Sequence, residues 1–235
     1  MQPGEKMRLR AFFASTLLLI TVATLISPVL AQGQATSSGL PGQDRDVGQL
    51  LPKHAVITAR LKVNFGDGIK PDAEAITFTL PPVYAVSYNA GLRILGRRRT
   101  SGWRVLYEET PDVEPGQDEL ILKKVKARSG SEALVVAYYH SGAGTTTDWK
   151  IVAAHGGKLR SIESRQIRDK VLRQRKSTFG GYNGVRVEGD IVAERIPMYS
   201  NHTARCCPDR PPIEMRVRFT GTALKLDSVI DLPDK

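Results

Sequence analysis

The clearest pattern in the sequence is the alternation of apolar and polar residues in short segments. Apolar side chains occupy every second position over residues 55–65, and they do so again over residues 213–219, with charged residues between them. A period of two is typical of a β-strand with one buried face. Further short apolar segments lie at residues 76–80, 92–95, 103–107, 133–139, 149–154 and 185–189. Gly, Pro and Ser residues separate them, so the sequence predicts an antiparallel all-β fold.

One segment has a helical pattern instead. When residues 165–176 are placed on a helix, Ile167, Val171 and Leu172 lie close to one face. The sequence therefore predicts one short helix, which joins two β parts of the chain.

The β segments also form an internal repeat with an offset of 56–58 residues. The matched pairs are residues 73–78 with 131–136, 92–95 with 149–152, and 103–108 with 159–163. A weaker third copy extends from Val185 to Leu226. Repeats of about this length are typical of propeller blades, each of which is a small antiparallel meander. We expect meanders arranged either as propeller-blade-like repeats or as a β-sandwich.

The beginning of the chain has the composition of an export signal. Lys6, Arg8 and Arg10 precede an uncharged, apolar stretch over residues 11–30, and Val29-Leu30-Ala31 offers small residues at a signal peptidase site. An uncleaved membrane anchor is the alternative, because about 20 apolar residues can span a bilayer. We predict a cleaved signal peptide at residues 1–31 and a secreted or periplasmic protein.

The rest of the chain divides by composition. Residues 32–52 are rich in Gly, Ser, Gln and Pro, which is typical of a flexible linker. Two β repeats are expected over residues 53–164. The short helix and a C-terminal β unit with a Cys-Cys-Pro loop are expected over residues 165–235.

Positive charge dominates the composition. Lys and Arg together number 34 against 24 Asp and Glu, which gives a net charge of +10. Such an excess favours polyanions, here anionic lipid headgroups or acidic envelope polymers, although a solvated basic surface is the plainer interpretation. The candidate polyanion-binding residues are Arg97, Arg98, Arg99, Lys123 and Lys124, and residues 158–176 are also basic. An exported protein is not expected to bind nucleic acid.

Aromatic residues near these arginines allow two interpretations. Trp103 and Tyr107 could stack on single strands beside the basic residues. However, Trp103 belongs to an apolar strand segment, so we expect it in the core.

The stretch NFGDGIKPDAEAITF (64–78) resembles the first loop and strand of secreted FG-GAP/VCBS-type repeats. The resemblance puts Asp67 and Gly68 at the central Asp-Gly of the family loop, with Asp72 or Glu74 at its closing acidic position. It implies a calcium site, which needs several oxygen ligands. Val63 and Phe65 fall on ligand positions here and offer no side-chain oxygen, so we expect a tight turn and no metal or other cofactor.

The second copy of this loop, KARSGSEALVV, keeps only Glu132 of the acidic positions. The C-terminal segment resembles one in small secreted bacterial proteins of unknown function. Tyr199, the Cys206-Cys207-Pro208 run and the strand with Arg216 and Arg218 carry that resemblance. Neither family pattern implies a defined reaction.

The only two cysteines of the chain are adjacent, Cys206 and Cys207. In an oxidising compartment they are expected to pair with each other, although neighbouring Cα atoms are about 3.8 Å apart and such a bond is strained. Free buried thiols, redox chemistry, metal binding with His202 and an intermolecular bond are the alternatives. Thiol exchange usually uses C-x-x-C at a helix N-terminus, which this proline-rich loop lacks. The pair is therefore predicted to be structural.

Motifs for catalysis are absent from the sequence: it contains no nucleophile elbow, zinc-protease motif, P-loop or dinucleotide fingerprint. The acid pairs Asp112/Glu114 and Asp118/Glu119 are interpreted as a solvated connector, and His54, His140 and His155 as turn or surface residues. We predict a monomeric, non-catalytic β-repeat module that binds or scaffolds at the envelope. The alternative is a secreted enzyme, a thiol oxidoreductase or hydrolase, without a recognisable motif.

Overall fold

The computed structural model describes residues 47–66, 68–69, 73–81, 89–98, 102–109, 117–140, 148–178, 184–200 and 208–233. All of them belong to one compact unit that spans residues 39–235. The predicted signal peptide and residues 32–46 of the predicted linker lie outside the described residues.

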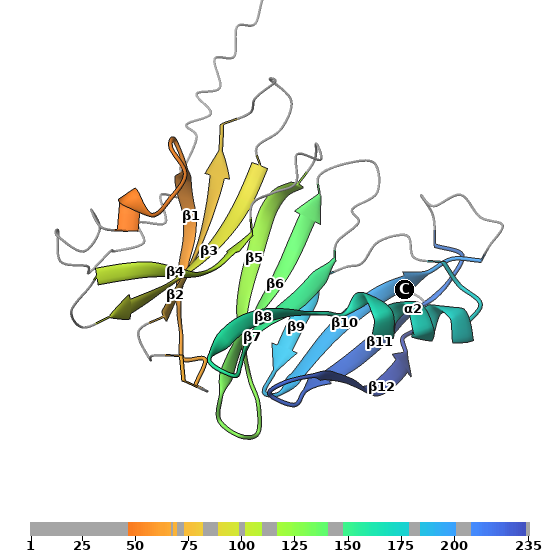
Figure 1. The fold of residues 1–235 in the computed structure, drawn as a ribbon. Helices are drawn as coiled ribbons and strands as arrows, with labels where there is room; N and C mark the ends of the chain where they lie inside the picture. The colour runs from red at the N-terminus through yellow and green to blue at the C-terminus, as the bar shows by residue number, and fades with distance from the viewer. Residues whose placement is uncertain are drawn as a thin grey trace, which may run out of the picture. The chain divides into compact units, whose positions relative to one another are not determined.

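The described strands form three four-stranded antiparallel sheets, and in each sheet the strands lie in chain order (Figure 1). The first sheet contains β1 (Val56–Val63), β2 (Ala73–Leu80), β3 (Asn89–Arg98) and β4 (Gly102–Glu109). The middle sheet contains β5 (Gln117–Lys126), β6 (Glu132–His140), β7 (Trp149–His155) and β8 (Lys158–Glu163). The third sheet contains β9 (Val185–Glu188), β10 (Ile191–Met198), β11 (Arg210–Phe219) and β12 (Leu224–Asp231). The prediction of an all-β fold built from antiparallel meanders is confirmed.

The sequence repeat matches strands at equivalent places in successive sheets. Its three pairs of segments fall on β2 with β6, β3 with β7, and β4 with β8. The weaker third copy falls on the third sheet. The unit that repeats is therefore one meander.

One interpretation of the sequence was wrong. Residues 117–119 belong to β5, so Asp118 and Glu119 are not in a solvated acidic connector. Leu120 and Val125 of this strand are buried, and the many charged residues around them conceal the strand pattern in the sequence. Asp112 and Glu114 lie outside the described residues.

The middle sheet is covered on both faces, which explains the continuous apolar run in β6. Leu134 and Val136 pack in a core with residues of the first sheet, which we call the first interface. Ala133, Val135 and Ala137, on the opposite face, pack in a core with residues of the third sheet, the second interface. Because successive side chains of a strand point to opposite faces, β6 must be apolar at nearly every position.

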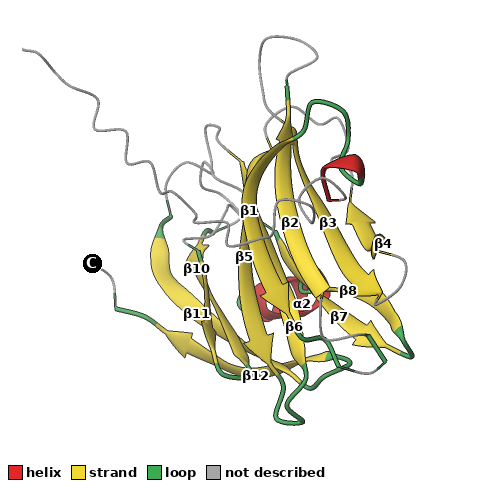
Figure 2. Ribbon diagram, turned by 90° about the vertical axis from the view of Figure 1, so that its left-hand side faces the viewer, coloured by secondary structure: helices red, strands yellow, loops and turns green. Residues whose placement is uncertain are grey.

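Helix α2 (Arg165–Gln174) follows β8 directly, and the prediction of one short helix is confirmed (Figure 2). Its residues Val171 and Leu172 are buried in the second interface, and Ile167 packs against the same core. The other described helical part is a turn at residues 47–49. It belongs to residues 47–51, whose Val47 forms a small separate core with Ile76 and Leu95 of the first sheet. The prediction of a flexible linker over residues 32–52 is therefore wrong for residues 47–51, because their apolar side chains pack against the first sheet.

Trp103 packs against this small core and is partly buried, as expected for a residue of an apolar strand. The prediction that it serves packing rather than stacking on a ligand agrees with this position.

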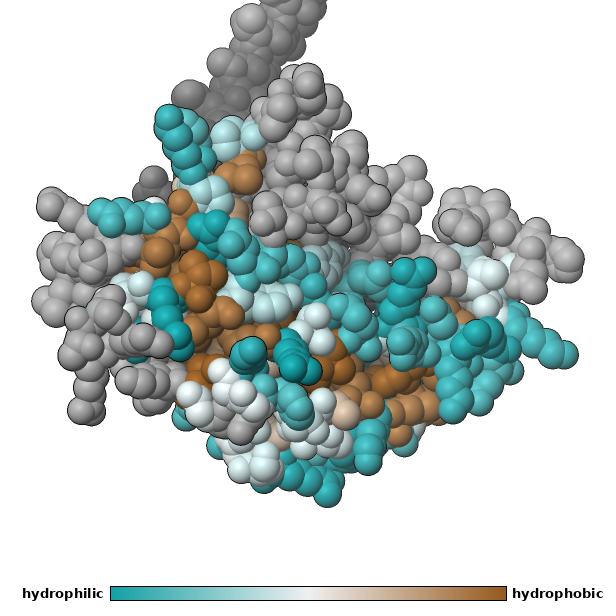
Figure 3. Space-filling view, in the orientation of Figure 1, coloured by the Kyte–Doolittle hydropathy of each residue, from teal (hydrophilic) through white to brown (hydrophobic). Residues whose placement is uncertain are grey.

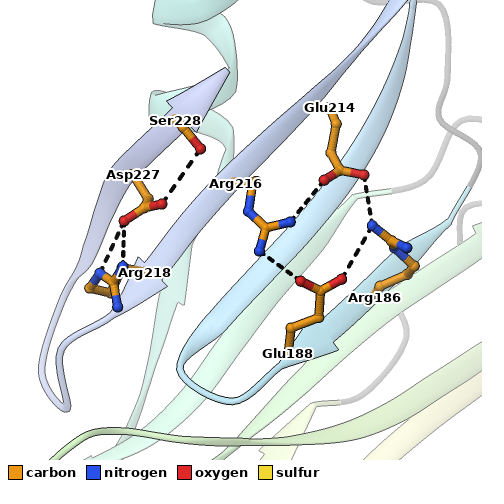
Figure 4. Close-up of polar contacts among 7 residues, drawn as sticks. All are labelled: Arg186, Glu188, Glu214, Arg216, Arg218, Asp227 and Ser228. Carbon is orange, nitrogen blue, oxygen red and sulfur yellow. Dashed lines mark hydrogen bonds and ion pairs between the residues drawn. The ribbon is translucent and has the colours of Figure 1, made fainter. Parts of the chain in front are cut away.

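The third sheet carries ion pairs on the face opposite the second interface (Figure 4). Along β11, Met215, Val217 and Phe219 are buried, whereas Arg216 and Arg218 alternate with them and are partly exposed. Arg216 lies 2.6 Å from Glu188 and 3.0 Å from Glu214. A polar outer face of this kind is what ends a stack of repeats in water.

Candidate functional site

The first interface contains a cluster of polar side chains from both sheets. Glu109 is the last residue of β4, while Tyr138 and Lys150 belong to β6 and β7. The Lys150 Nζ lies 2.6 Å from Oε1 of Glu109, and the Tyr138 hydroxyl donates a hydrogen bond to the same oxygen. The Lys150 Nζ also lies 5.2 Å from the centre of the Tyr138 ring, where a cation is attracted to the ring face.

A second phenol completes this cluster. The Tyr107 hydroxyl donates a hydrogen bond of 3.3 Å to Oε2 of Glu109. Burial raises the pKa of Tyr107, and the negative charge of Glu109 raises it further. Burial also raises the pKa of Tyr138, together with its hydrogen bond to Glu109. Both phenols are therefore neutral hydrogen-bond donors at physiological pH.

The polar groups of this cluster form hydrogen bonds and an ion pair with one another across the first interface. The Glu109 side chain keeps 23% of its surface exposed and that of Lys150 11%, so the pair is partly desolvated. Partial burial strengthens an ion pair relative to one in water. The cluster therefore attaches the end of β4 to β6 and β7.

The second interface contains a buried carboxyl group. Glu194 lies on the face of β10 that Val192 and Ile196 contribute to the core, and its side chain has no exposed surface. The Trp149 Nε1 donates a hydrogen bond of 2.6 Å to Oε2 of Glu194. From α2, the Nη1 of Arg168 lies 3.6 Å from Oε1 of Glu194.

Burial raises the pKa of Glu194 to about 7, although the charge of Arg168 and the hydrogen bond from Trp149 act in the opposite direction. The 3.6 Å separation is longer than a hydrogen bond, so the two charges are only loosely paired. Arg168 itself is 2% exposed and also bonds to the carboxylate of Asp148. The protonation of Glu194 thus changes near neutral pH inside the protein core.

These contacts hold α2 in place. Ser164 precedes the helix, and its hydroxyl donates a hydrogen bond of 2.5 Å to the backbone oxygen of Trp149 rather than capping the helix. At the other end, the Arg210 Nη1 donates a hydrogen bond of 2.8 Å to the backbone oxygen of Arg175. The helix is therefore tied to the middle sheet and to the third sheet.

The loop that resembles FG-GAP/VCBS repeats makes a tight turn. Gly66 and Gly68 have positive φ angles of 63° and 78°, and the Ile69 N–H donates a hydrogen bond of 2.9 Å to the Gly66 oxygen. Val63 and Phe65 are buried in the first interface. Asp67 and Asp72 lie outside the described residues.

Glu132, the acidic residue that the second copy of this loop retains, connects the two copies. Its carboxylate accepts a hydrogen bond of 2.9 Å from the Asn64 N–H, and its own N–H donates one of 3.0 Å to the Asn64 oxygen. The hydrogen bond from the Asn64 N–H lowers the pKa of Glu132, and the bond from Lys124 lowers it further. The acidic position thus serves contact between repeats.

Two of the candidate polyanion-binding residues, Lys123 and Lys124, do not share a face of the middle sheet. Lys123 donates a hydrogen bond to the backbone oxygen of Val185 in β9, whereas Lys124 lies 3.4 Å from Glu132 within the middle sheet. As neighbours in a strand they point to opposite faces. Arg97 is exposed near the end of β3. Arg98 is in the same strand, and Arg99 lies outside the described residues.

Cys206 and Cys207 lie outside the described residues, as does His202. The residues on either side of this segment meet: the Ser200 N–H donates a hydrogen bond of 2.8 Å to the Asp209 carboxylate. His54 is exposed with a positive φ of 68°, and His155 is exposed at the end of β7. Among the residues that the structure describes, no group of three or more His, Cys, Asp or Glu could hold a metal ion.

The sequence did contain a signal for the cluster in the second interface. Glu194 stands between Val192 and Ile196 at apolar positions of period two, and Arg168 stands three and four residues before Val171 and Leu172. A charged residue in an apolar register is a candidate for a buried, paired group.

Comparison with known proteins adds no family. No protein-family model matches this chain, and no curated protein matches it. In the part of the chain that the structure describes, no helix is both long and apolar enough to cross a membrane.

Proposed function

We propose that this chain is an exported, non-catalytic β-repeat module that binds or scaffolds a partner at the cell envelope. The observation that carries the proposal is the pairing of Glu109 with Lys150 and of Glu194 with Trp149 and Arg168. Each of these partially or fully buried groups is used to join one element to another. The arrangement of these buried groups is explained by a structural role in the scaffold.

The repeated architecture supports the same function. Stacked meanders present extended faces and many loops, which is how repeat proteins bind their partners. The relationship to FG-GAP/VCBS-type repeats that we propose is a degenerate one, and it rests on the sequence resemblance of residues 64–78. Within this proposal the protein is a monomer, the N-terminal segment directs export, and Cys206 and Cys207 form a structural vicinal disulfide.

The test determines where the protein is located and whether it catalyses thiol exchange. The full chain is expressed in an exporting host, and the culture fluid and envelope fractions are compared with the cytoplasm. We expect it outside the cytoplasm, with Gln32 as the N-terminal residue. The exported chain and its Cys206→Ser/Cys207→Ser variant are then compared in insulin reduction, and neither should exceed the buffer rate. Turnover by the wild type that the variant loses would make it a thiol oxidoreductase.

A further inference from the structure

Half of the chain's net charge lies in one short segment. Residues 165–176, which comprise α2 and the two residues after it, contain six Lys or Arg residues and one Asp, a net charge of +5 out of +10. The predicted groups at residues 97–99 and 123–124 are shorter and carry net charges of +3 and +2. Residues 165–176 therefore carry the largest total charge of the three groups, although not the highest density of charge.

Three of the six cations are engaged with carboxylates. Arg168 is buried against Asp148 and Glu194. Arg165 lies 3.8 Å from Asp169, one turn further along the helix. Arg175 lies 2.6 Å from Asp231, the last residue of β12.

The other three cations, Lys170, Arg173 and Lys176, are exposed, and none has an acidic partner among the described residues. Lys170 and Arg173 are three residues apart, so they are neighbours along one side of the helix. We call these three residues the basic row. Figure 3 shows that the surface over α2 is hydrophilic.

The helix presents the basic row from a fixed position. Val171 and Leu172 are buried in the second interface, and contacts at both ends tie the helix down. Because the backbone is already ordered, a ligand has only side chains to immobilise. Helix-dipole stabilisation explains cations in the last turn, but it does not explain Lys170, which lies before that turn.

Lys170 and Arg173 stand on the exposed side of α2, and Lys176 lies two residues beyond its end. Because the exposed side of a surface helix projects outward, these residues suit a broad, flat anionic surface better than a single polymer chain held in a groove. The exposed uncharged residues of the helix, Gln166 and Gln174, are not aromatic, so nothing there stacks on bases. The apolar side of α2 is buried, so the contact is electrostatic and does not involve insertion.

We infer that the basic row docks the protein on the surface of an anionic lipid bilayer. The inference rests on the proposed function at the envelope and names the surface that makes the contact. Lys and Arg near an anionic membrane contribute about a factor of five in affinity each. Removing three of them therefore lowers the affinity about a hundredfold.

The test measures sedimentation of the protein with vesicles. One set is phosphatidylcholine alone and the other contains about one third phosphatidylglycerol. The protein used is the exported chain that begins at Gln32, and the readout is the ratio of the two partition coefficients. We expect the Lys170→Gln/Arg173→Gln/Lys176→Gln variant to lower this ratio about a hundredfold. Added salt should lower the wild-type ratio in the same direction.

The matched control removes three exposed cations from other elements, in the variant Lys62→Gln/Arg104→Gln/Lys225→Gln. It loses the same charge and should lower the ratio by less than tenfold. Equal losses in both variants would show that only net charge matters and would overturn the inference. Melting curves of both variants should match the wild type, because all six residues are exposed.

Binding of inorganic polyphosphate, a soluble polyanion, tests the alternative ligand, which is an anionic polymer. Binding of polyphosphate through the basic row without binding to anionic vesicles would overturn the lipid assignment in favour of a polymer. Failure of the wild type to distinguish anionic from neutral vesicles would also overturn it. Neither result changes the insulin assay, so the proposed function can fail or survive separately.

Discussion

Both interfaces of the middle sheet contain a charged pair between packed elements, but the two pairs differ in geometry and in burial. In each, a glutamate from an outer sheet meets a basic residue and an aromatic side chain, and neighbouring residues of β7, Trp149 and Lys150, serve the two sides. The Lys150 ammonium lies 2.6 Å from its carboxylate, whereas the Arg168 guanidinium lies 3.6 Å from Glu194. The first pair retains contact with water and the second has almost none.

The difference shows what burial does to the same chemical groups. Full burial of an ion pair costs several kcal/mol per charge, and attraction repays this only with close geometry. Around Glu194 that geometry is loose, and its pKa rises to about 7. Around Glu109 the contacts are short and partly hydrated, so the ion pair adds attachment without a comparable desolvation cost. The second interface positions α2 specifically, and the first stabilises a sheet contact.

The largest expected effect is the removal of the cation at the second interface. Arg168→Met leaves the Glu194 carboxylate buried beside Trp149, and Asp148 loses its partner as well. Loss of one partner of a buried pair costs about 3–5 kcal/mol in the free energy of unfolding. Urea denaturation at slightly alkaline pH measures it, because Glu194 is then ionised.

The matched control is Arg173→Met in the same helix. Arg173 is exposed, so this variant should differ from the wild type by no more than about 0.5 kcal/mol. If Arg168→Met cost as little as the control, the buried pair would contribute nothing to holding α2.

The next effect is a dependence of stability on pH that originates at Glu194. Its pKa is raised from 4.5 in the unfolded chain to about 7 in the native state. The native state therefore binds the proton more tightly, and the free energy of unfolding falls as the pH rises through this window. The part of the fall that originates at Glu194 amounts to about 3 kcal/mol, and Glu194→Gln should remove it. Burial also raises the pKa of Glu163, and the contribution of Glu163 is retained in this variant. Urea denaturation across the window measures the slope.

The charged groups that face Glu194 are Arg168 and Asp148, and Trp149, which also faces it, is uncharged. Glu132 serves as a control because its pKa is lowered. Its contribution is lost only in acid below this window, so Glu132→Gln should leave the slope unchanged. An unchanged slope in Glu194→Gln would assign the pH dependence to another group.

A smaller effect is expected at the first interface. Lys150→Met removes the cation next to Glu109, but the carboxylate can recover solvent because 23% of its surface is exposed. The free energy of unfolding should fall by about 1–2 kcal/mol, and less in the double variant with Glu109→Gln. Lys158→Met, an exposed position in the same sheet, is the control. A loss as large as that of Arg168→Met would show that the first pair is as desolvated as the second.

The fold was predictable wherever each strand carried a clean pattern. The alternation of Ile213, Met215 and Val217 with charged residues predicts β11, and an unbroken apolar run predicts β6. β5 and β10 were not predicted, because charged residues interrupt their apolar positions. At Glu194 and Lys123 the charged group meets a partner from another element.

The candidate site was less predictable for a geometric reason. Glu109 meets Tyr138 and Lys150 only because the first sheet packs face to face on the middle sheet, and no sequence spacing encodes that contact. The basic row was different: residues 158–176 were recognisably basic, but only the structure separates Arg168 inside from Lys170 outside. Burial, rather than composition, decides which cations face a ligand.

The smallest effect is expected on the outer face of the third sheet, where the Arg216 and Glu188 side chains keep 23% and 42% of their surface exposed, more than those of Lys150 and Glu109 keep. Arg216 bridges Glu188 and Glu214 there, and its side chain is 23% exposed. Exposed ion pairs contribute little and are screened by salt, so Arg216→Gln should lower the melting temperature by no more than about 2–4 °C. Thermal unfolding in low and high salt measures this, and the difference from wild type should vanish in high salt. The adjacent Met215→Ala, which opens a cavity on the buried face of the same strand, should cost far more at any salt concentration. A large, salt-independent loss in Arg216→Gln would mean that water does not reach this network, and the outer face of the third sheet would then be an interface rather than the end of the stack.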